Sequence, residues 1–205
     1  MNQVLNDLEK YDLTQLLIVT KNQTIQDINE LISKGFDTFG ENKVQEAKKK
    51  YNFENIIDKV NLHLIGPLQT NKVKDALQIF NTIQSVDREK LINEISKVMK
   101  KSNFIKTNSF YLQINIGSES QKSGIEKTQS KELYQYALDK NLNIEGLMCI
   151  PPNSRSVNEY FSEMNEIRKK INPNLKLSMG MSNDYQIALD HYSNLIRVGS
   201  LIFDD

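Results

Sequence analysis

One lysine in this sequence stands where side-chain chemistry is expected. Lys21 comes just after Leu16–Val19, a short apolar run with a β-branched end, from which only Thr20 separates it. Such a run is typical of a buried strand. A lysine at the carboxyl end of a strand lies at the rim of a core, where loss of water lowers the pKa of an amine and frees it for Schiff-base formation. Most strand-end lysines are simply solvated, so this pattern needs support from the rest of the chain.

Two stretches near the carboxyl terminus resemble a cradle for an anion. Ser178–Ser182 ends one apolar run and precedes a helix, and Arg197–Ser200 ends another. Small hydroxyl residues and glycine expose backbone N–H groups, which bind phosphate well at a helix N-terminus. The alternative is that Ser178 and Ser182 only cap the following helix, and the residues alone leave the two interpretations about equal.

Other reactive side chains point to no further site. Lys122 is a rival amine, but it lies in a polar stretch that offers no desolvation. Cys149, the one cysteine, is surrounded by apolar residues and is expected to be a buried structural thiol. His63 and His191 have no partners at metal-ligand spacing, so no metal site is predicted. His63 is expected to be a hydrogen-bonded histidine inside the fold and His191 a surface residue.

Strand-like and helix-like segments alternate along almost the whole chain. Thr24 is expected to cap a helix that ends at Gly35, and Asp87 to cap another. Lys48, Lys49 and Lys50 are expected on the solvated face of a helix that begins near Lys43. The expected strands are Leu16–Val19, Thr38–Glu41, Asn61–Gly66, Thr82–Val86, Phe110–Ile116, Ile144–Ile150, Leu175–Met179 and Leu195–Val198.

Eight strands separated by helices predict parallel pairing, because crossover connections are needed between parallel neighbours. Eight is the number of strands in the closed (β/α)₈ barrel, the TIM barrel, so this α/β fold is the prediction, as one domain over residues 1–205. A doubly wound open sheet is the alternative. Sites in such barrels lie at the carboxyl ends of the strands, where Lys21 and both serine–glycine stretches are expected.

The composition excludes several classes of protein. The 26 basic and 26 acidic residues give no net charge, so there is no overall attraction for nucleic acid. No apolar run is long enough to span a bilayer, and the first residues do not resemble a signal peptide. With a single cysteine no intrachain disulfide can form, which fits a reducing cytoplasm.

Several segments, spread in order over nearly the whole chain, carry a resemblance to a known family. They are Val19–Lys21, Phe39–Glu46, His63–Lys72, Ser85–Asp87, Lys122–Gly124, Gly146–Met148, Ile150–Pro152, Ser178–Ser182 and Ile196–Phe203. In these the chain resembles the pyridoxal phosphate homeostasis proteins, which are related in fold to the N-terminal barrel of alanine racemase. Asn22 and Ser200 stand where that family often has threonine.

The resemblance implies that pyridoxal 5′-phosphate is bound as a Schiff base on Lys21. It implies phosphate contacts from Ser178, Gly199 and Ser200, and places Arg197 opposite the pyridine nitrogen. Asn42 and Met179 would line the ring of the cofactor. No catalytic residue is implied.

We interpret the sequence as that of a cytoplasmic, monomeric pyridoxal phosphate carrier that takes part in vitamin B6 homeostasis rather than as an enzyme. Its expected partners are the cofactor and apo forms of pyridoxal phosphate enzymes, not nucleic acid or a membrane. An arginine opposite the pyridine nitrogen keeps its own proton, which leaves the ring a poorer electron sink. The alternatives are a racemase-like pyridoxal phosphate enzyme and a cofactor-free interaction barrel.

Overall fold

The structure is a computed structural model, and it describes residues 1–11, 13–51, 53–119, 121–152 and 156–203. Its strands alternate with helices as the sequence predicts. The strands are β1 (Gln15–Val19), β2 (Thr38–Glu41), β3 (Asn61–Leu64), β4 (Thr82–Val86), β5 (Ser109–Asn115), β6 (Ile125–Glu126), β7 (Ile144–Cys149), β8 (Lys176–Ser178) and β9 (Leu195–Val198). The α-helices are α1 (Asn2–Leu8), α2 (Ile25–Ser33), α3 (Val44–Tyr51), α4 (Val73–Ile79), α5 (Glu89–Lys101), α6 (Ser130–Asp139), α7 (Val157–Ile171), α8 (Tyr185–Asp190) and α9 (Ser200–Phe203). Three short 3₁₀ helices are η1 (Phe53–Asp58), η2 (Thr70–Lys72) and η3 (Lys127–Gln129).

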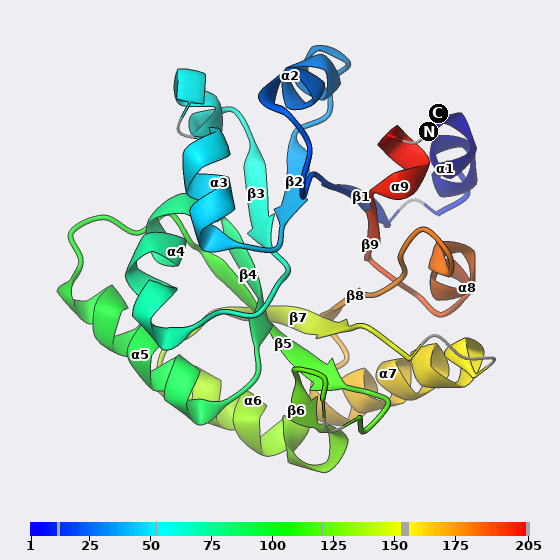
Figure 1. Cartoon of the computed structure of the whole chain (residues 1–205). Helices are drawn as coiled ribbons and strands as arrows, with labels where there is room; N and C mark the ends of the chain where they lie inside the picture. The colour runs from blue at the N-terminus through cyan, green and yellow to red at the C-terminus, as the bar shows by residue number, and fades with distance from the viewer. Residues whose placement is uncertain (12, 52, 120, 153–155, 204–205) are drawn as a thin grey trace.

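Eight of these strands close into a parallel barrel. The ring runs β1-β2-β3-β4-β5-β7-β8-β9, and the pairing of β9 with β1 closes it. The helices surround the ring, and the first and last helices lie side by side (Figure 1). The predicted (β/α)₈ barrel is therefore confirmed, and the open-sheet alternative is wrong. The two-residue strand β6, which the sequence pattern did not reveal, pairs with β5 outside the ring.

Local sequence signals predict the boundaries of one helix correctly and the cap of another incorrectly. Thr24 caps α2 in a capping box with Asp27, and Gly35 follows the helix at a φ of 90°, as expected. The predicted capping role of Asp87 is wrong. Arg88 occupies the N-cap position of α5 without a side-chain cap, because the Asp87 carboxylate instead accepts a hydrogen bond from the Arg88 guanidinium.

The hydrophobic core lies mainly between the ring and its helices. A smaller cluster of Leu17, Ile65 and Leu195 packs separately from it. Leu17 pairs in register with Arg197, so both side chains share the inner face of the barrel. The interior of the barrel thus combines a small apolar plug with buried polar side chains. Among the described residues no helix is long and apolar enough to cross a membrane.

Candidate functional site

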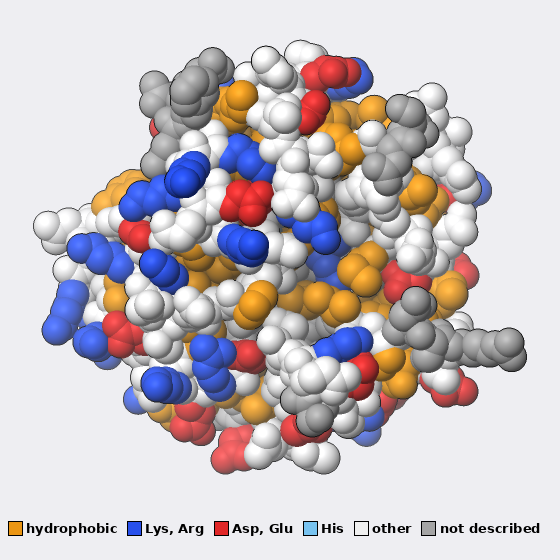
Figure 2. Space-filling model, viewed as in Figure 1, with side chains coloured by type: hydrophobic (Ala, Val, Ile, Leu, Met, Phe, Trp, Pro, Cys, Tyr) orange, Lys and Arg blue, Asp and Glu red, His pale blue; other side chains and the backbone are white. Residues whose placement is uncertain are grey.

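A cavity of about 570 Å³ opens at the carboxyl ends of the barrel strands. Its volume is in the range of small-molecule sites. Figure 2 shows Lys and Arg side chains around the middle of this face, with hydrophobic side chains between them. The lining comes from the ends of several strands and the loops beyond them: Val19, Lys21, Asn42, Ile65, Gly66, Pro67, Gln113, Gln121, Lys122, Ser123, Ile150, Met181, Ser182, Arg197, Gly199 and Ser200.

Lys21 lies in this cavity, separated from β1 by Thr20 alone, and it is exposed. The sequence pattern predicted that Lys21 would lose contact with water at the rim of the core. In the structure it remains exposed, because β1 ends at Val19. Within the described part of the chain no ion pair or hydrogen bond holds its amine. The rival Lys122 also lines the cavity, but its Nζ lies 2.5 Å from Glu119 Oε2 and donates to the Pro151 carbonyl. Of the two amines, that of Lys122 is engaged by neighbouring oxygen atoms.

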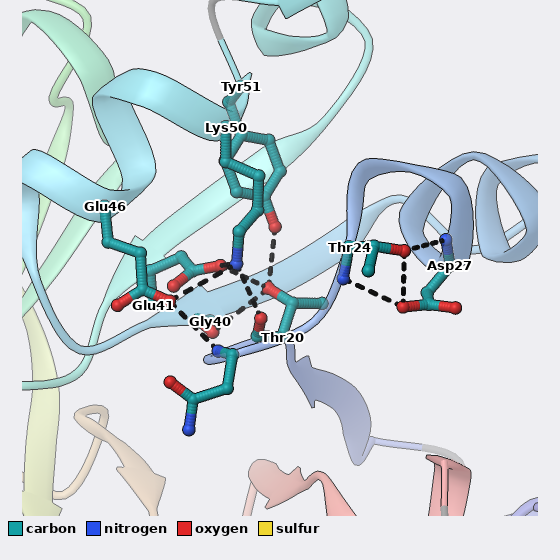
Figure 3. A network of polar contacts seen from close by, with 9 residues as sticks. Thr20, Thr24, Asp27, Gly40, Glu41, Glu46, Lys50 and Tyr51 are labelled. Atoms are coloured by element: carbon teal, nitrogen blue, oxygen red, sulfur yellow. Dashed lines mark hydrogen bonds and ion pairs between the residues drawn. The ribbon is translucent and has the colours of Figure 1, made fainter.

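The backbone at Lys21 is held by a polar network built on α3 (Figure 3). Lys50 Nζ donates to the Thr20 carbonyl at 2.8 Å and to Glu41 Oε1 at 2.8 Å. Glu46 accepts from the Asn22 backbone N–H at 3.0 Å, and Asn22 has a φ of 63°. The residues on both sides of Lys21 are therefore fixed, while its side chain is left free.

This network overturns one prediction. Lys48 and Lys49 are exposed, as a solvated helix face requires, but only 10% of the Lys50 side chain is exposed. Lys50 turns inward because Glu41 ends β2 fully buried and requires a cation nearby. Burial raises the pKa of the Glu41 carboxyl, and Lys50 opposes that shift. Tyr51 completes the network through its hydroxyl, 2.7 Å from Thr20 Oγ1, and burial raises the pKa of this phenol.

Arg197 forms the buried wall of the cavity. Its side chain is on the inner face of β9, with only 3% of the residue exposed. Nη1 donates to Ser178 Oγ at 2.8 Å and Nη2 donates to the Cys149 carbonyl at 2.7 Å. Burial lowers the pKa of the guanidinium, and the charge of Asp184 opposes that shift, although no carboxylate of the described residues lies within ion-pair distance of it. A buried cation with neutral partners can present donors to a ligand acceptor.

Gly66 brings a second predicted residue, Asn42, into the cavity. A Cβ at Gly66 would lie 2.2 Å from the Asn42 carbonyl oxygen, so only glycine allows the loop after β3 to pass so close. This approach fixes the backbone after β2 and places Asn42 beside Gly66 in the lining.

The predicted anion cradle is present only in part. Gly199 and Ser200 line the cavity where α9 begins, and the first N–H groups of a helix have no partner within it. Ser178 and Met179 do not line it. The Ser178 hydroxyl donates to Gln84 inside the barrel, and Met179 is buried in the main core. Ser182 and Met181, further along the same segment, line the cavity in their place.

The structure thus places Ser178 and Met179 outside the cavity lining, and the cofactor contacts expected of them stay predictions. The Ser178 hydroxyl, on the inner face of the barrel, is hydrogen-bonded to Gln84 and Arg197 below the cavity. Met179 packs in the main core. The lining residues that the sequence did not reveal include Ile65 and Gln113, whereas Ser182 belongs to the stretch predicted as an anion cradle. Their position at strand ends was the signal available, but it does not say which of several adjacent side chains turns into the cavity.

The remaining reactive groups behave as structural residues. Cys149 is buried, and burial raises the pKa of its thiol to about 12. His63 accepts or donates a hydrogen bond with Gln84 through Nδ1, but its Nε2 is buried without a partner. The described residues contain no group of histidine, cysteine and acidic side chains that could hold a metal ion.

Residues 8–205 match the family model described as alanine racemase, N-terminal domain. The pyridoxal phosphate homeostasis protein of Aquifex aeolicus is 36% identical over 200 residues, which cover 93% of this chain and 86% of that protein. The protein of the same name from Synechocystis sp. is 34% identical over 200 residues, covering 93% and 91%.

Solved structures show the same relationship. PipY of Synechococcus elongatus with PLP bound has a TM-score of 0.83 and 29% identity, covering 98% of both chains. An alanine racemase from Bartonella henselae with covalently bound pyridoxal phosphate has a TM-score of 0.76 over 98% of this chain and 56% of its own. At 15% identity the racemase shares the fold alone.

Proposed function

Because this chain belongs to the family of pyridoxal phosphate homeostasis proteins, and to the wider family of the alanine racemase N-terminal domain, we propose that it holds pyridoxal 5′-phosphate and serves vitamin B6 homeostasis. The observation that carries the proposal is a pair of side chains in one cavity. The amine of Lys21 lies unpaired in the same lining as the buried guanidinium of Arg197. A primary amine forms a Schiff base with an aldehyde, and a guanidinium can donate to an unprotonated pyridine nitrogen.

The residues present fit this cofactor. Lys21 would carry its aldehyde carbon as a Schiff base, and Arg197 would donate to the ring nitrogen. Gly199, Ser200 and Ser182 offer neutral donors for the phosphate, and Asn42 with Met181 would flank the ring. When bound, the cofactor supplies an electron-withdrawing ring.

Arg197 and the composition of the lining favour a carrier over an enzyme. A guanidinium keeps its proton, so the ring nitrogen it faces stays neutral and the ring withdraws electrons less strongly. Among the described residues that line the cavity, Lys21, Lys122 and Arg197 are the titratable ones. Racemisation needs a second acid–base group opposite the lysine, and the amine of Lys122 is engaged by Glu119.

We extend the proposal to the domain organisation, oligomeric state, location and partners of the protein. We take residues 1–205 as one cofactor-binding barrel domain that acts as a monomer in the cytoplasm, where the free thiol of Cys149 stays reduced. Its partners in exchange of the cofactor would be apo forms of pyridoxal phosphate enzymes. The runner-up function is a racemase-like enzyme, which the fold alone supports.

Borohydride reduction tests the proposal. The protein is incubated with pyridoxal phosphate, its absorption spectrum is recorded, and the reduced product is digested and mapped by mass spectrometry. We expect the reduced cofactor on the peptide of Lys21, its loss in Lys21→Ala, and its retention in the matched variant Lys122→Ala. A label on Lys122 would show the assignment to be wrong.

A wild-type protein that stays colourless and unlabelled would favour the cofactor-free interaction barrel. Turnover of alanine or serine at ordinary enzyme rates, about 1 to 10³ per second, would instead promote the racemase-like function.

A further inference from the structure

A chain of hydrogen bonds crosses the inside of the barrel beneath the cavity. Gln84 in β4 is fully buried and does not line the cavity. Its Oε1 accepts from Ser178 Oγ at 2.6 Å, and Ser178 Oγ in turn accepts from Arg197 Nη1 at 2.8 Å. On its other side Gln84 Nε2 lies 2.8 Å from His63 Nδ1. Strands β3, β4, β8 and β9 are thus joined through side chains alone.

The direction of each bond in this chain is fixed by chemistry. A guanidinium has donors only, so Arg197 must donate to the Ser178 oxygen. The single hydroxyl proton of Ser178 then needs another acceptor, and Gln84 Oε1 is the acceptor that lies within reach. Gln84 is thereby obliged to turn its NH₂ group toward His63.

His63 completes the arrangement by accepting that NH₂ group. Burial lowers the pKa of His63 to about 4, so the imidazole is neutral near pH 7 and its Nδ1 carries a lone pair. The ring proton then sits on Nε2, which has no partner and is buried. Leaving a donor unsatisfied costs free energy, so the fold retains His63 here at a cost.

The chain of bonds acts on the orientation of Arg197. No carboxylate of the described residues pairs with this guanidinium, so its plane is set by two neutral acceptors, Ser178 Oγ and the Cys149 carbonyl. The Cys149 carbonyl belongs to the backbone of β7 and is rigid. The Ser178 hydroxyl can rotate, and Gln84 is what holds it with its lone pairs toward Arg197.

We propose that Gln84, oriented by His63, is a positioning residue that fixes the Arg197 guanidinium through Ser178 and so sets the environment of the cofactor's ring nitrogen. The inference rests on the proposed function, because it concerns how this cavity would hold pyridoxal phosphate. Gln84 touches no part of the cavity, so its effect reaches the cofactor only through Ser178 and Arg197.

The test compares the absorption spectra of the loaded variants. Gln84→Met removes both hydrogen bonds with little change of shape, and we expect it to shift the visible absorption maximum of the bound cofactor. Trapping of the cofactor at Lys21 should weaken by less than about tenfold, since no direct contact is lost. Ser178→Ala should give the same shift, and the double variant no larger one, because both changes break one chain of bonds.

Thr82→Val is the matched control. Thr82 Oγ1 lies 2.7 Å from Ser109 Oγ, also buried, in a pair that does not contact Arg197. This variant should lower stability to a similar degree while the spectrum stays that of wild type. If Gln84→Met folds poorly, Ser178→Ala decides alone, because it deletes a single oxygen from the chain.

Two outcomes would overturn the inference and leave the proposed function standing. One is a wild-type spectrum in Gln84→Met or Ser178→Ala, and the other is an equal shift in Thr82→Val. A wild-type protein that traps no cofactor at all would overturn the proposed function itself.

Discussion

Lys50 Nζ lies 2.8 Å from Glu41 Oε1, in a pair whose carboxylate is fully buried and whose ammonium is nearly so. The same ammonium donates to the carbonyl of Thr20, the residue before Lys21. An ion pair inside the fold and the backbone just before Lys21 therefore share one cation. Loss of that cation affects both stability and the position of Lys21.

Replacing this cation should be strongly destabilising. Lys50→Met leaves Glu41 as a buried charge without its partner, and we expect the free energy of unfolding to fall by about 3 to 5 kcal/mol. Lys49→Met, on the exposed side of the same helix, is the matched control and should change it by less than about 0.5 kcal/mol. Urea unfolding followed by circular dichroism measures both, and equal midpoints for the two variants would contradict the role given to Lys50.

His63 should make the fold sensitive to acid. Its folded pKa is about 4, below the ordinary value of 6.5, so the stability it contributes is complete above pH 6.5 and is lost as the pH falls through about 4. The loss over that interval should be about 3 kcal/mol.

The variant His63→Asn isolates this effect. The asparagine offers Gln84 an acceptor oxygen but cannot take up a proton, so its stability should depend less on pH over the same interval. His191→Asn controls for the loss of a histidine outside the barrel and should retain the wild-type pH dependence. Urea unfolding at a series of pH values measures the difference, and parallel curves for wild type and His63→Asn would refute the assignment.

The phosphate should contribute to binding through neutral donors. Gly199 and Ser200 lie in the cavity at the start of α9, where the first N–H groups of a helix have no acceptor within the helix. Pyridoxal should therefore bind clearly more weakly than its phosphate. Ser200→Ala should weaken the phosphate form by about tenfold and pyridoxal hardly at all, because only the former contacts the hydroxyl. Equilibrium titrations followed by absorbance measure both, and equal affinities would argue against this cradle.

Arg197 should set the electronic character of the cofactor more than its retention. Arg197→Glu would favour a protonated, more electron-withdrawing ring, so the absorption spectrum of the loaded protein should change. Turnover of alanine or serine should still be negligible, because no acid–base group is added opposite Lys21. Chiral chromatography of the amino acids measures turnover, after circular dichroism has established that the variant folds. Efficient racemisation by this variant would show that the protonation state of the ring nitrogen alone had limited turnover.

The sequence predicts the barrel well because its strands are short apolar runs bounded by glycine and polar residues. Thr38–Glu41, Thr82–Val86 and Leu195–Val198 have the predicted bounds, and the other barrel strands differ by one or two residues at their ends. Which side chains face the cavity was harder to predict. Ser178 and Met179 are neighbours that point to opposite faces of β8 or its continuation, and neither lines the cavity.

The burial of Lys50 is a second feature that could not be predicted from the sequence. It follows two exposed lysines, and nothing local distinguishes it from them. Its burial depends on Glu41, which only the folded barrel brings beside it. The exposure of Lys21 has a similar cause, since the length of β1 alone does not show where the rim of the barrel lies.

The closed ring also limits what the protein can offer to another chain. Every barrel strand is paired on both sides, and among the described strands only β6, two residues long, has a free edge. Proteins that recognise one another by adding a strand need a longer exposed edge than this. A recipient enzyme of the kind proposed would therefore have to meet the loops and helices around the cavity. Intermolecular strand pairing, a common start of aggregation, has little template in the described strands.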